Sequence, residues 1–381
     1  MFIKYKGIAI NISIIPFNTS NKRDVSLKWQ NLEKRAESNV FLSWAWIGSW
    51  LDLITGKVFI VEAEDNNRVV GLGFLVEKER KIFGLFSIKQ WYLHRTGNTP
   101  QDQIWIEHND FLLDANVAEL VRKEMIDSVC VFASHIHEVI IGLSTDNVIR
   151  SFTSCFHHDF PDITPLIETN AYTVETQSYT EEVKEKFINE VLSKNTRSQV
   201  ARSEKLLKQL GEVDFSIITQ ADEVRALIKN IAKIHIERWS NSVEGSGFTN
   251  SVFNDFHDAM INDDENNVVQ IAVLSLNKEP VGYLLNYVYK DQVCFYLSAL
   301  TSFDDNKIKV GLTLHTKAIQ YYIDQGIYSY DFLGGDARYK RSMSNKKYNL
   351  VMNCYQRKYL LLKLENKFKN YKAIFKKVLS C

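Results

Sequence analysis

Val269-Gln-Ile-Ala-Val-Leu-Ser-Leu-Asn-Lys-Glu-Pro-Val-Gly-Tyr-Leu-Leu-Asn-Tyr287 is a β-rich run, a polar turn and a second β-rich run that opens with Val-Gly. This pattern is typical of a β-hairpin. An earlier stretch, Val58-Phe-Ile-Val-Glu-Ala-Glu-Asp-Asn-Asn-Arg-Val-Val-Gly-Leu-Gly-Phe-Leu-Val76, has the same pattern. The two hairpins align on Gly71 and Gly282, which are 211 positions apart in the chain.

A helical, tryptophan-containing segment precedes each hairpin. Residues 27–51 hold Trp44, Trp46 and Trp50, and residues 222–239 end at Trp239. A helix followed by a hairpin, repeated at one offset, indicates two copies of the same unit. We therefore expect an α/β (α+β) fold of two tandem units, each a mixed, mostly antiparallel sheet flanked by helices.

Both halves continue with further strands and helices. In the second half we expect a strand over 292–300, a loop over 301–309, a helix over 310–325 stopped by Gly326, and a strand over 328–333. In the first half we expect a helix over 117–134 and a strand over 138–143. Two prolines near residues 160–165 indicate a junction. The predicted domains are 1–165, 166–356 and a basic amphipathic C-terminal helix over 357–381.

Composition restricts the function classes. The 381 residues include 46 Lys+Arg and 46 Asp+Glu, so the balanced charge argues against DNA binding by phosphate neutralisation. The five cysteines are widely spaced and odd in number, which favours reduced thiols in a cytoplasmic protein. No apolar run is long enough to span a bilayer. We expect Met1 to Phe17 to form an opening strand rather than a signal peptide.

The tail over 357–377 is strongly basic, with Glu365 as its one acidic residue. Apolar residues recur through it, so we expect a helix packed on the domain. A peripheral contact with an anionic membrane surface is the alternative, on the inner face of the membrane. Its basic residues are Arg357, Lys358, Lys363, Lys367, Lys369, Lys372, Lys376 and Lys377.

The segment Asp331-Phe-Leu-Gly-Gly-Asp-Ala-Arg-Tyr-Lys340 follows the last expected strand. Ligands bind at the carboxyl edge of open α/β sheets, and this segment gathers acids, a phenol and cations there. Transfer of an acyl group to an amine needs a base, an acid for the leaving group and a partner for the oxyanion. We assign Asp336 as base or acceptor-orienting group, Tyr339 as acid and Lys340 as anion partner. A Gly-Gly turn with an Asp–Lys surface pair is the alternative.

The helix start near residue 310 is a candidate pyrophosphate site. A helix N-terminus presents N–H groups without intrahelical partners and a positive dipole end. A solvated turn with two surface lysines is the alternative here. The candidate donor-binding residues are Lys307, Lys309, Val310, Gly311 and Leu312.

Further candidates for substrate binding are polar or aromatic residues near the predicted site. Arg197 is able to bind phosphate or carboxylate, or to lie on a solvated helix face. His235 is a base, a substrate contact or a buried histidine beside Trp239. The paired histidines at 135/137 and 157/158 lack further ligands at useful spacing, so we predict no metal site. The full set is Arg197, His235, Arg238, Trp239 and Asp331.

These motifs together resemble those of a known family. The series Ser193…Asn195-Thr-Arg197, His235…Arg238-Trp239, Val281-Gly282 and Tyr330-Asp-Phe-Leu-Gly-Gly-Asp-Ala-Arg-Tyr-Lys340 is similar to that of CelD/BcsL-type acetyltransferases. These belong to the GNAT superfamily and are similar to the FemAB peptidyltransferases. The resemblance implies a double-GNAT fold whose C-terminal unit binds the acyl donor, acetyl-CoA or another acyl-CoA, and a link to polysaccharide or cell-envelope pathways. The N-terminal unit is then degenerate and shapes the acceptor cleft.

Three functions remain open from the sequence. The first is an acyl-CoA-dependent N-acyltransferase acting on an amino sugar or a similar small cell-envelope precursor. The second is a FemAB-like transferase that uses aminoacyl-tRNA. The third is a catalytically degenerate GNAT domain that binds a ligand or partner.

Overall fold

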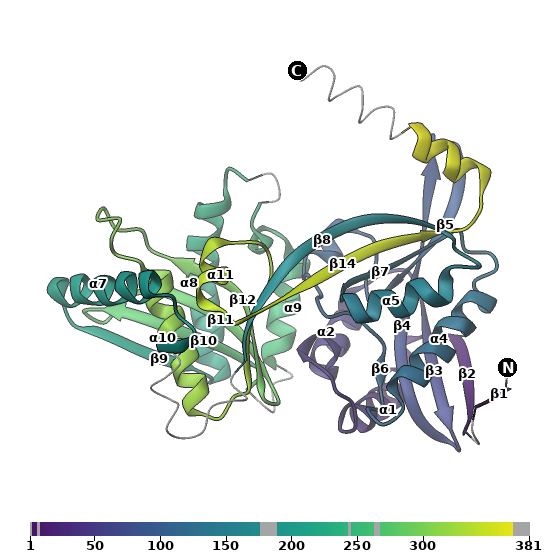
Figure 1. Ribbon diagram of the computed structural model, residues 1–381, viewed down its shortest axis with the longest axis horizontal. Coiled ribbons are helices and arrows are strands. Elements are labelled where there is room, and N and C mark those ends of the chain that lie inside the picture. Colours follow the sequence, from purple (N-terminus) through teal and green to yellow (C-terminus); the bar gives the residue numbers. More distant parts are fainter. Residues whose placement is uncertain (1, 6–7, 176–188, 243–244, 263–266, 369–381) are drawn as a thin grey trace. The chain divides into compact units, whose positions relative to one another are not determined.

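The computed structural model describes residues 2–5, 8–175, 189–242, 245–262 and 267–368, and the chain forms two compact units (Figure 1). The first unit comprises Met1–Glu168 and Leu350–Cys381, and the second comprises Thr169–Asn349. The sequence pattern also predicts a helix over 180–211. Its part over 180–188, and the part of the predicted C-terminal helix over 369–381, lie outside the described residues. Within the described residues, no helix combines the length and the apolar character that crossing a bilayer requires.

The first unit is built on a sheet in which six strands neighbour one another in the order β1-β2-β3-β4-β5-β7, with β14 beyond β7. All these pairs are antiparallel except β5 with β7. Its strands are β1 (Phe2–Tyr5), β2 (Ile8–Pro16), β3 (Lys57–Asp65), β4 (Arg68–Ile82), β5 (Phe86–Leu93), β6 (Leu112–Leu113, paired with β4), β7 (Glu138–Thr145) and β14 (Lys346–Gln356). Its helices are α1 (Lys22–Glu33), α2 (Trp44–Leu53), α3 (Thr99–Asp102), α4 (Ala118–Phe132) and α5 (Asp146–Phe156).

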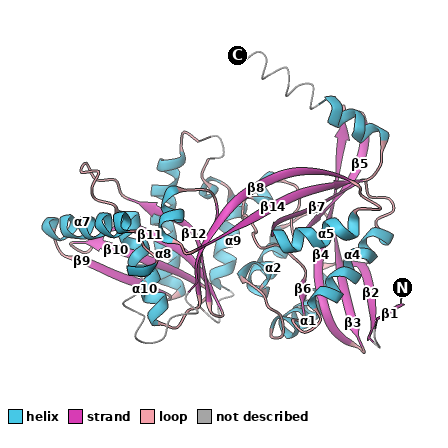
Figure 2. Cartoon of the chain, in the orientation of Figure 1, coloured by secondary structure: helices cyan, strands magenta, loops and turns pink. Residues whose placement is uncertain are grey.

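The second unit repeats this plan, with strands in the order β9-β10-β11-β12-β13-β8. Again one pair, β12 with β13, is parallel and the others are antiparallel. Its strands are β8 (Asp162–Glu175), β9 (Val213–Ile218), β10 (Val269–Leu276), β11 (Glu279–Tyr289), β12 (Gln292–Leu300) and β13 (Ser329–Gly334). Its helices, which flank the sheet in Figure 2, are α7 (Lys194–Leu210), α8 (Ala221–Trp239), α9 (Ser251–Asn262), α10 (Val310–Asp324) and α11 (Arg338–Met343).

The two aligned glycines have the same structural role. A Cβ atom on Gly282 would lie 2.8 Å from the Val310 side chain of α10. A Cβ atom on Gly71 would lie 2.7 Å from the Val121 side chain of α4. In each unit a glycine on the second hairpin strand therefore lets a helix pack directly on the sheet. The predicted tandem α/β fold is confirmed.

Each unit has its own apolar core. In the first unit, side chains of α4 and α5 pack on the sheet around Trp91 and Phe152. In the second unit, α7 and α10 contribute Leu207, Leu314 and Ile319 to a core that includes strand residues such as Leu284. Burying side chains of this size contributes about 1.5–3 kcal/mol each, so the two cores fix the position of the helices on each sheet.

The chain passes between the units along β8 and β14. The predicted junction at 160–165 lies close to the boundary between the units at Glu168, and Pro165 lies within β8, since a proline is compatible with a strand position whose N–H is not needed. Residues Leu350 to Gln356 pair with β7 of the first unit, although the predicted boundary placed them in the second. The sequence of residues 350–356 gave no signal of this distant pairing.

Candidate functional site

The strands β12 and β13 part within the second unit. Their parallel register covers only Gln292↔Ser329, Val293↔Tyr330 and Cys294↔Asp331. Beyond this point β13 stays with β8, with a register shift that ends at Gly334↔Ala171. Leu333 and Gly335 adopt left-handed backbone angles, with φ of 59° and 113°, which turn the chain at the end of β13. The remaining half of β12 therefore runs on without β13 beside it.

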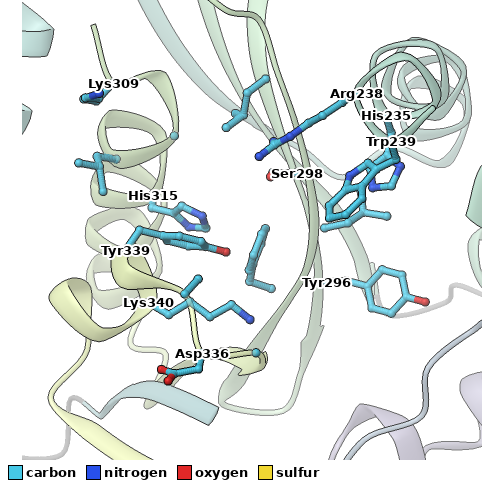
Figure 3. A pocket seen from close by; sticks show the side chains of 17 residues that line it. His235, Arg238, Trp239, Tyr296, Ser298, Lys309, His315, Asp336, Tyr339 and Lys340 are labelled. Carbon is cyan, nitrogen blue, oxygen red and sulfur yellow. The ribbon is translucent and has the colours of Figure 1, made fainter. Parts of the chain in front are cut away.

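A cavity of about 750 Å³ lies where the two strands part. Its walls are β12, the C-terminal end of α8, the N-terminal half of α10 and the segment from Gly335 to Lys340 (Figure 3). A cavity of this size, with mainly apolar walls and a few convergent polar groups, is typical of a small-molecule site.

Nine of the residues predicted from the sequence line this one cavity. They come from three separate stretches of the chain that meet around the cavity. These residues are Asp336, Tyr339, Lys340, Lys309, Gly311, Leu312, His235, Arg238 and Trp239. Lys307, Val310, Arg197 and Asp331 are not among the residues that line it.

Asp336 lies half-exposed at the rim of the cavity. Its carboxylate accepts a hydrogen bond from the Tyr172 hydroxyl at 2.6 Å and forms an ion pair with Arg341 at 2.5 Å. The bond from Tyr172, together with Arg341, lowers the pKa of the Asp336 carboxyl. Asp336 is therefore ionised and held by two partners. This arrangement favours an orienting role over that of a strong base, and both roles belonged to the prediction.

Tyr339 points into the cavity from α11, and its ring stacks on the imidazole of His315 with centroids 5.5 Å apart (Figure 3). Burial raises the pKa of the Tyr339 hydroxyl to about 12, although the positive charge of Arg238 lowers it in part. A phenol with this pKa keeps its proton at neutral pH, so it is suited to donate a hydrogen bond or a proton.

Lys340 is buried, and its ammonium supports the turn that follows β13. It donates hydrogen bonds to the carbonyl oxygens of Gly334 at 2.5 Å and Leu333 at 3.3 Å. Lys340 thus holds the turn in its left-handed geometry and brings a positive charge to the cavity wall. The anion-partner role predicted for it rests on this charge.

The end of α8 supplies the opposite wall. His235 accepts or donates a hydrogen bond at Nδ1 to the Ser246 hydroxyl at 2.8 Å and stacks on Trp239, with centroids 5.9 Å apart. Burial, with the nearby charge of Arg238, lowers the pKa of His235 to about 4, so its ring is neutral at physiological pH. Trp239 remains 42% exposed and offers an aromatic surface to a bound molecule.

The start of α10 reaches the cavity through Lys309, Gly311 and Leu312. The first bond inside the helix runs from the Thr313 N–H to the Lys309 carbonyl, so the preceding N–H groups have no intrahelical acceptor. Ser203 of α7 fixes this turn, because its hydroxyl accepts hydrogen bonds from the Lys309 N–H at 2.8 Å and the Thr313 hydroxyl at 2.9 Å. The geometry suits an anionic group.

The predicted residues outside the cavity wall have structural contacts. Arg197 donates hydrogen bonds to the carbonyls of Asn189 and Leu192 and so caps the turn before α7. Asp331 accepts hydrogen bonds from the Leu333 N–H at 2.7 Å and from Tyr348 at 2.6 Å, which fixes the end of β13. Val310 is buried in the core of the second unit. Lys307 lies in the loop before α10, where its N–H bonds the Asp305 carboxylate.

His315 of α10, together with Tyr296 and Ser298 of β12, also lines the cavity and was not predicted. His315 is buried, and its Nδ1 shares a hydrogen bond of 3.1 Å with the Tyr330 hydroxyl. Burial and the charge of Lys340 lower the pKa of His315 to about 3. The sequence did contain one signal, since a histidine one helical turn after Gly311 must lie on the same face of α10.

The corresponding gap in the first unit is closed. There β5 and β7 pair in parallel only over Gln90↔Glu138 to Tyr92↔Ile140. Beyond this point Asn109 bridges the strands, because its side-chain amide donates to the Leu93 carbonyl at 2.8 Å and the Gly142 carbonyl at 3.1 Å. Asn109 is fully buried, and its Oδ1 lies 2.9 Å from Nδ1 of His94. Asn109 thus occupies the gap between these two strands.

Comparison with known proteins agrees with this geometry. Residues 194–341 match the model of the acetyltransferase (GNAT) domain family. The fold is similar to that of FemX, with a TM-score of 0.59, 10% identity, and coverage of 93% of this chain and 99% of that one. It is also similar to the C-terminal domain of a candidate lysylphosphatidylglycerol synthetase from Agrobacterium fabrum (TM-score 0.53, 8% identity, 93% and 97% coverage). No curated protein sequence shows significant similarity to the chain.

A third similar structure is L-PGS from Bacillus licheniformis, with a TM-score of 0.50, 11% identity, and coverage of 92% and 96%. At such identities these likenesses show a shared fold. The class follows from the domain match: residues 194–341, which include the parted strands and most of the cavity lining, carry a GNAT-type acetyltransferase domain. The prediction of an acyltransferase is confirmed, and the narrower CelD/BcsL type stays a prediction.

Proposed function

We propose that the second unit transfers an acyl group from acyl-CoA to the amine of a small acceptor. The observation that carries this proposal is the parting of β12 and β13 onto a cavity that reaches the start of α10. The unpaired part of β12 offers a strand edge along which a thioester arm can lie. The first turn of α10, with Lys309, offers N–H groups and a positive charge for the pyrophosphate of the donor.

The acceptor then lies between α8 and the segment 335–340. Trp239 provides an exposed aromatic face, and Arg238 and Asp336, which also line the cavity, carry opposite charges. An aromatic face with polar groups at its edge suits the ring of a sugar that carries an amine, whose cation is attracted by the Asp336 carboxylate. We therefore propose an amino sugar or a similar small cell-envelope precursor of polysaccharide synthesis as the acceptor, in line with the CelD/BcsL resemblance.

The proposed chemistry is direct attack. The neutral amine forms a bond to the thioester carbonyl carbon, and the carbonyl electrons move onto oxygen, near the charge of Lys340. The C–S bond then breaks as the carbonyl re-forms, and the thiolate takes a proton from Tyr339. The amine releases its proton to Asp336, directly or through water. The lowered pKa of Asp336 makes it a weak base, so its larger contribution is to hold the acceptor.

The first unit has a supporting role in this proposal. Asn109 occupies the gap between β5 and β7, and Arg122 holds the same segment through a bidentate ion pair with Asp110 at 2.7 Å. A thioester arm has no space to enter there. We propose that the first unit is a degenerate copy without a donor site of its own.

The direct test is release of free CoA thiol from acetyl-CoA and longer acyl-CoAs in the presence of an amine panel. The panel contains amino sugars, amino acids and polyamines, each beside its hydroxyl analogue. We expect thiol release that depends on an amino sugar and fails with the hydroxyl analogue. If acyl-CoA binds but no amine of the panel causes thiol release, this result contradicts the proposed acceptor class and leaves the proposed donor in place.

The likeness to FemX and the resemblance to FemAB peptidyltransferases favour a second candidate, an aminoacyl-tRNA donor. The balanced charge of the chain argues against it, because tRNA binding depends on phosphate neutralisation. Transfer of a labelled amino acid from charged tRNA, in place of thiol release from acyl-CoA, would decide for this candidate. If neither donor binds, the domain is a degenerate module that binds another ligand.

A further inference from the structure

The tip of the β4–β5 hairpin and the helix formed by residues 360–368 lie together on the first unit. Leu362 of this helix is buried against Ile82 and Ile88 of the hairpin. Arg80 of β4 forms an ion pair with Glu365 at 2.8 Å. Figure 1 shows the helix, in yellow, beside the ends of β4 and β5. One face of the helix is thus fixed to the hairpin by apolar and ionic contacts.

The opposite face of the helix is apolar and exposed. Leu360, Leu364 and Phe368 recur every fourth residue, so they form one stripe, and Leu360 is 70% exposed. The hairpin tip continues this surface with Phe83, whose ring meets that of Phe368 at 6.1 Å. We name the following six exposed side chains the tip patch: Phe83, Leu85, Phe86, Leu360, Leu364 and Phe368.

Four lysines are close in sequence to residues of the tip patch. Lys81, Lys358, Lys363 and Lys367 are all exposed, while Glu365 is engaged by Arg80. On a helical projection Lys363 and Lys367 fall beside the apolar stripe, at about 100° per residue. The surface therefore combines a cluster of large apolar side chains with an excess of positive charge.

We propose that the tip patch docks the first unit onto the surface of an anionic lipid bilayer. Large apolar side chains enter the interface, and lysines beside them bind the lipid phosphates with their stems along the apolar boundary. A second copy of the chain is a poor occupant, because a symmetric contact would bring the lysines of both copies together. This docking is independent of the acyl-transfer reaction.

The test is co-sedimentation of the full chain with vesicles of phosphatidylcholine alone and of phosphatidylcholine with 30% phosphatidylglycerol. We expect binding to the anionic vesicles that is at least tenfold tighter than to the neutral ones and that weakens in 0.5 M salt. Leu85→Ser and the pair Leu364→Ser/Phe368→Ser each weaken binding at least tenfold. Lys363→Glu/Lys367→Glu does the same, since it reverses two charges beside the stripe.

The control variant is Lys208→Glu/Leu210→Ser on α7, where Leu210 is similarly exposed, at 53%. It should bind the anionic vesicles as the unmodified chain does. Leu85 is 80% exposed at the hairpin tip, so we expect Leu85→Ser to leave the fold intact. This variant therefore tests the proposal even if the helix variants unfold. Equal binding by the Leu85→Ser variant, no binding to anionic vesicles, or a dimer in sedimentation without vesicle binding would each overturn the proposal.

Discussion

The Tyr339 ring stacks on the imidazole of His315, and the Tyr339 hydroxyl keeps its proton because burial raises its pKa to about 12. Replacing Tyr339 by Phe removes the hydroxyl and little else. We expect turnover to fall about 10²–10³-fold, within the usual contribution of a general acid, with acyl-CoA binding retained. Tyr321→Phe, a substitution at an exposed tyrosine of α10, is the matched control. Turnover equal to that of the control would remove Tyr339 from the reaction.

The same pKa gives a prediction for alkaline pH. A phenol is protonated below its pKa, so Tyr339 remains an acid throughout pH 7 to 9. Turnover should therefore not decline over this range. A plot of kcat against pH tests this, and a loss of turnover with a midpoint near pH 8 would assign proton donation to another group.

Asp336→Asn removes the charge that Tyr172 and Arg341 stabilise. We expect turnover to fall about 10²–10⁴-fold if the carboxylate accepts the proton, while a rise in KM for the acceptor alone would assign it to orientation. The fold should be intact, because the side chain is half-exposed, and circular dichroism checks this. Unchanged kcat and KM would exclude both roles.

At the scale of residues the sequence predicted much of the site. Asp336, Tyr339 and Lys340 stood out because chemically active side chains cluster after the last strand. Arg197 and Asp331 have equally suggestive side chains, yet their hydrogen bonds hold the backbone. Sequence pattern does not distinguish a guanidinium that binds ligand from one that caps a turn, because the difference lies in contacts with Asn189 and Leu192.

Among the elements, α10 depends on close contact with β11 at Gly282. A Cβ at this position would meet Val310 at 2.8 Å and Leu300 and Leu314 at 3.2 Å. Gly282→Ala should lower the free energy of unfolding by about 1–3 kcal/mol and weaken acyl-CoA binding, because it displaces the start of α10. Gly71→Ala, the corresponding change in the first unit, should cost stability without weakening acyl-CoA binding. Urea unfolding and calorimetry measure the two effects, and equal losses of binding would contradict the assignment of the donor to the second unit.

We expect the segment that closes the gap in the first unit to lose stability in acid. His94 is fully buried, its Nε2 accepts the Phe74 N–H at 3.0 Å, and burial lowers its pKa to about 4. An unfolded histidine has a pKa of about 6.5, so between pH 6.5 and 4 the unfolded chain binds more protons. The contribution of His94 to the free energy of unfolding is therefore complete above pH 6.5. It is lost as the pH falls towards 4, by about 1 kcal/mol per pH unit.

His94→Gln tests this dependence. The Gln side chain can still accept the Phe74 N–H but does not titrate, so the slope of the unfolding free energy against pH should decrease between pH 6.5 and 4. The slope should not disappear, because the buried His257 and His315, whose pKa values are lowered to about 3, contribute to it as well. An unchanged slope would show that His94 is not a source of the acid sensitivity.

At the scale of elements the hairpins, α8, β12 and α10 were predictable, because period-two and helical patterns are local. The parting of β12 from β13 was not, since it results from the left-handed turn at Leu333 and Gly335 and from the pairing of β13 with β8. The bridging of β5 and β7 by Asn109 in the first unit could not be predicted either. One side-chain amide that binds two carbonyl groups produces no periodic pattern in the sequence.

For the whole molecule, the repeat at an offset of 211 residues was sufficient to predict two related units. The repeat did not predict that Leu350–Gln356 pair with β7 of the first unit. Pairing between residues about 210 positions apart has no local sequence pattern. The chain therefore contains two copies of one fold. The second has an open cavity between its parted strands, and in the first Asn109 occupies the corresponding gap.

Isothermal titration of the full chain with acetyl-CoA, and with a longer acyl-CoA, is the clearest test of a single donor site in the second unit. We predict saturable binding of one thioester per chain, weakened by Gly282→Ala and unaffected by Gly71→Ala. No binding of any thioester would contradict an acyl-CoA donor, and binding of two per chain would contradict the closure of the first unit.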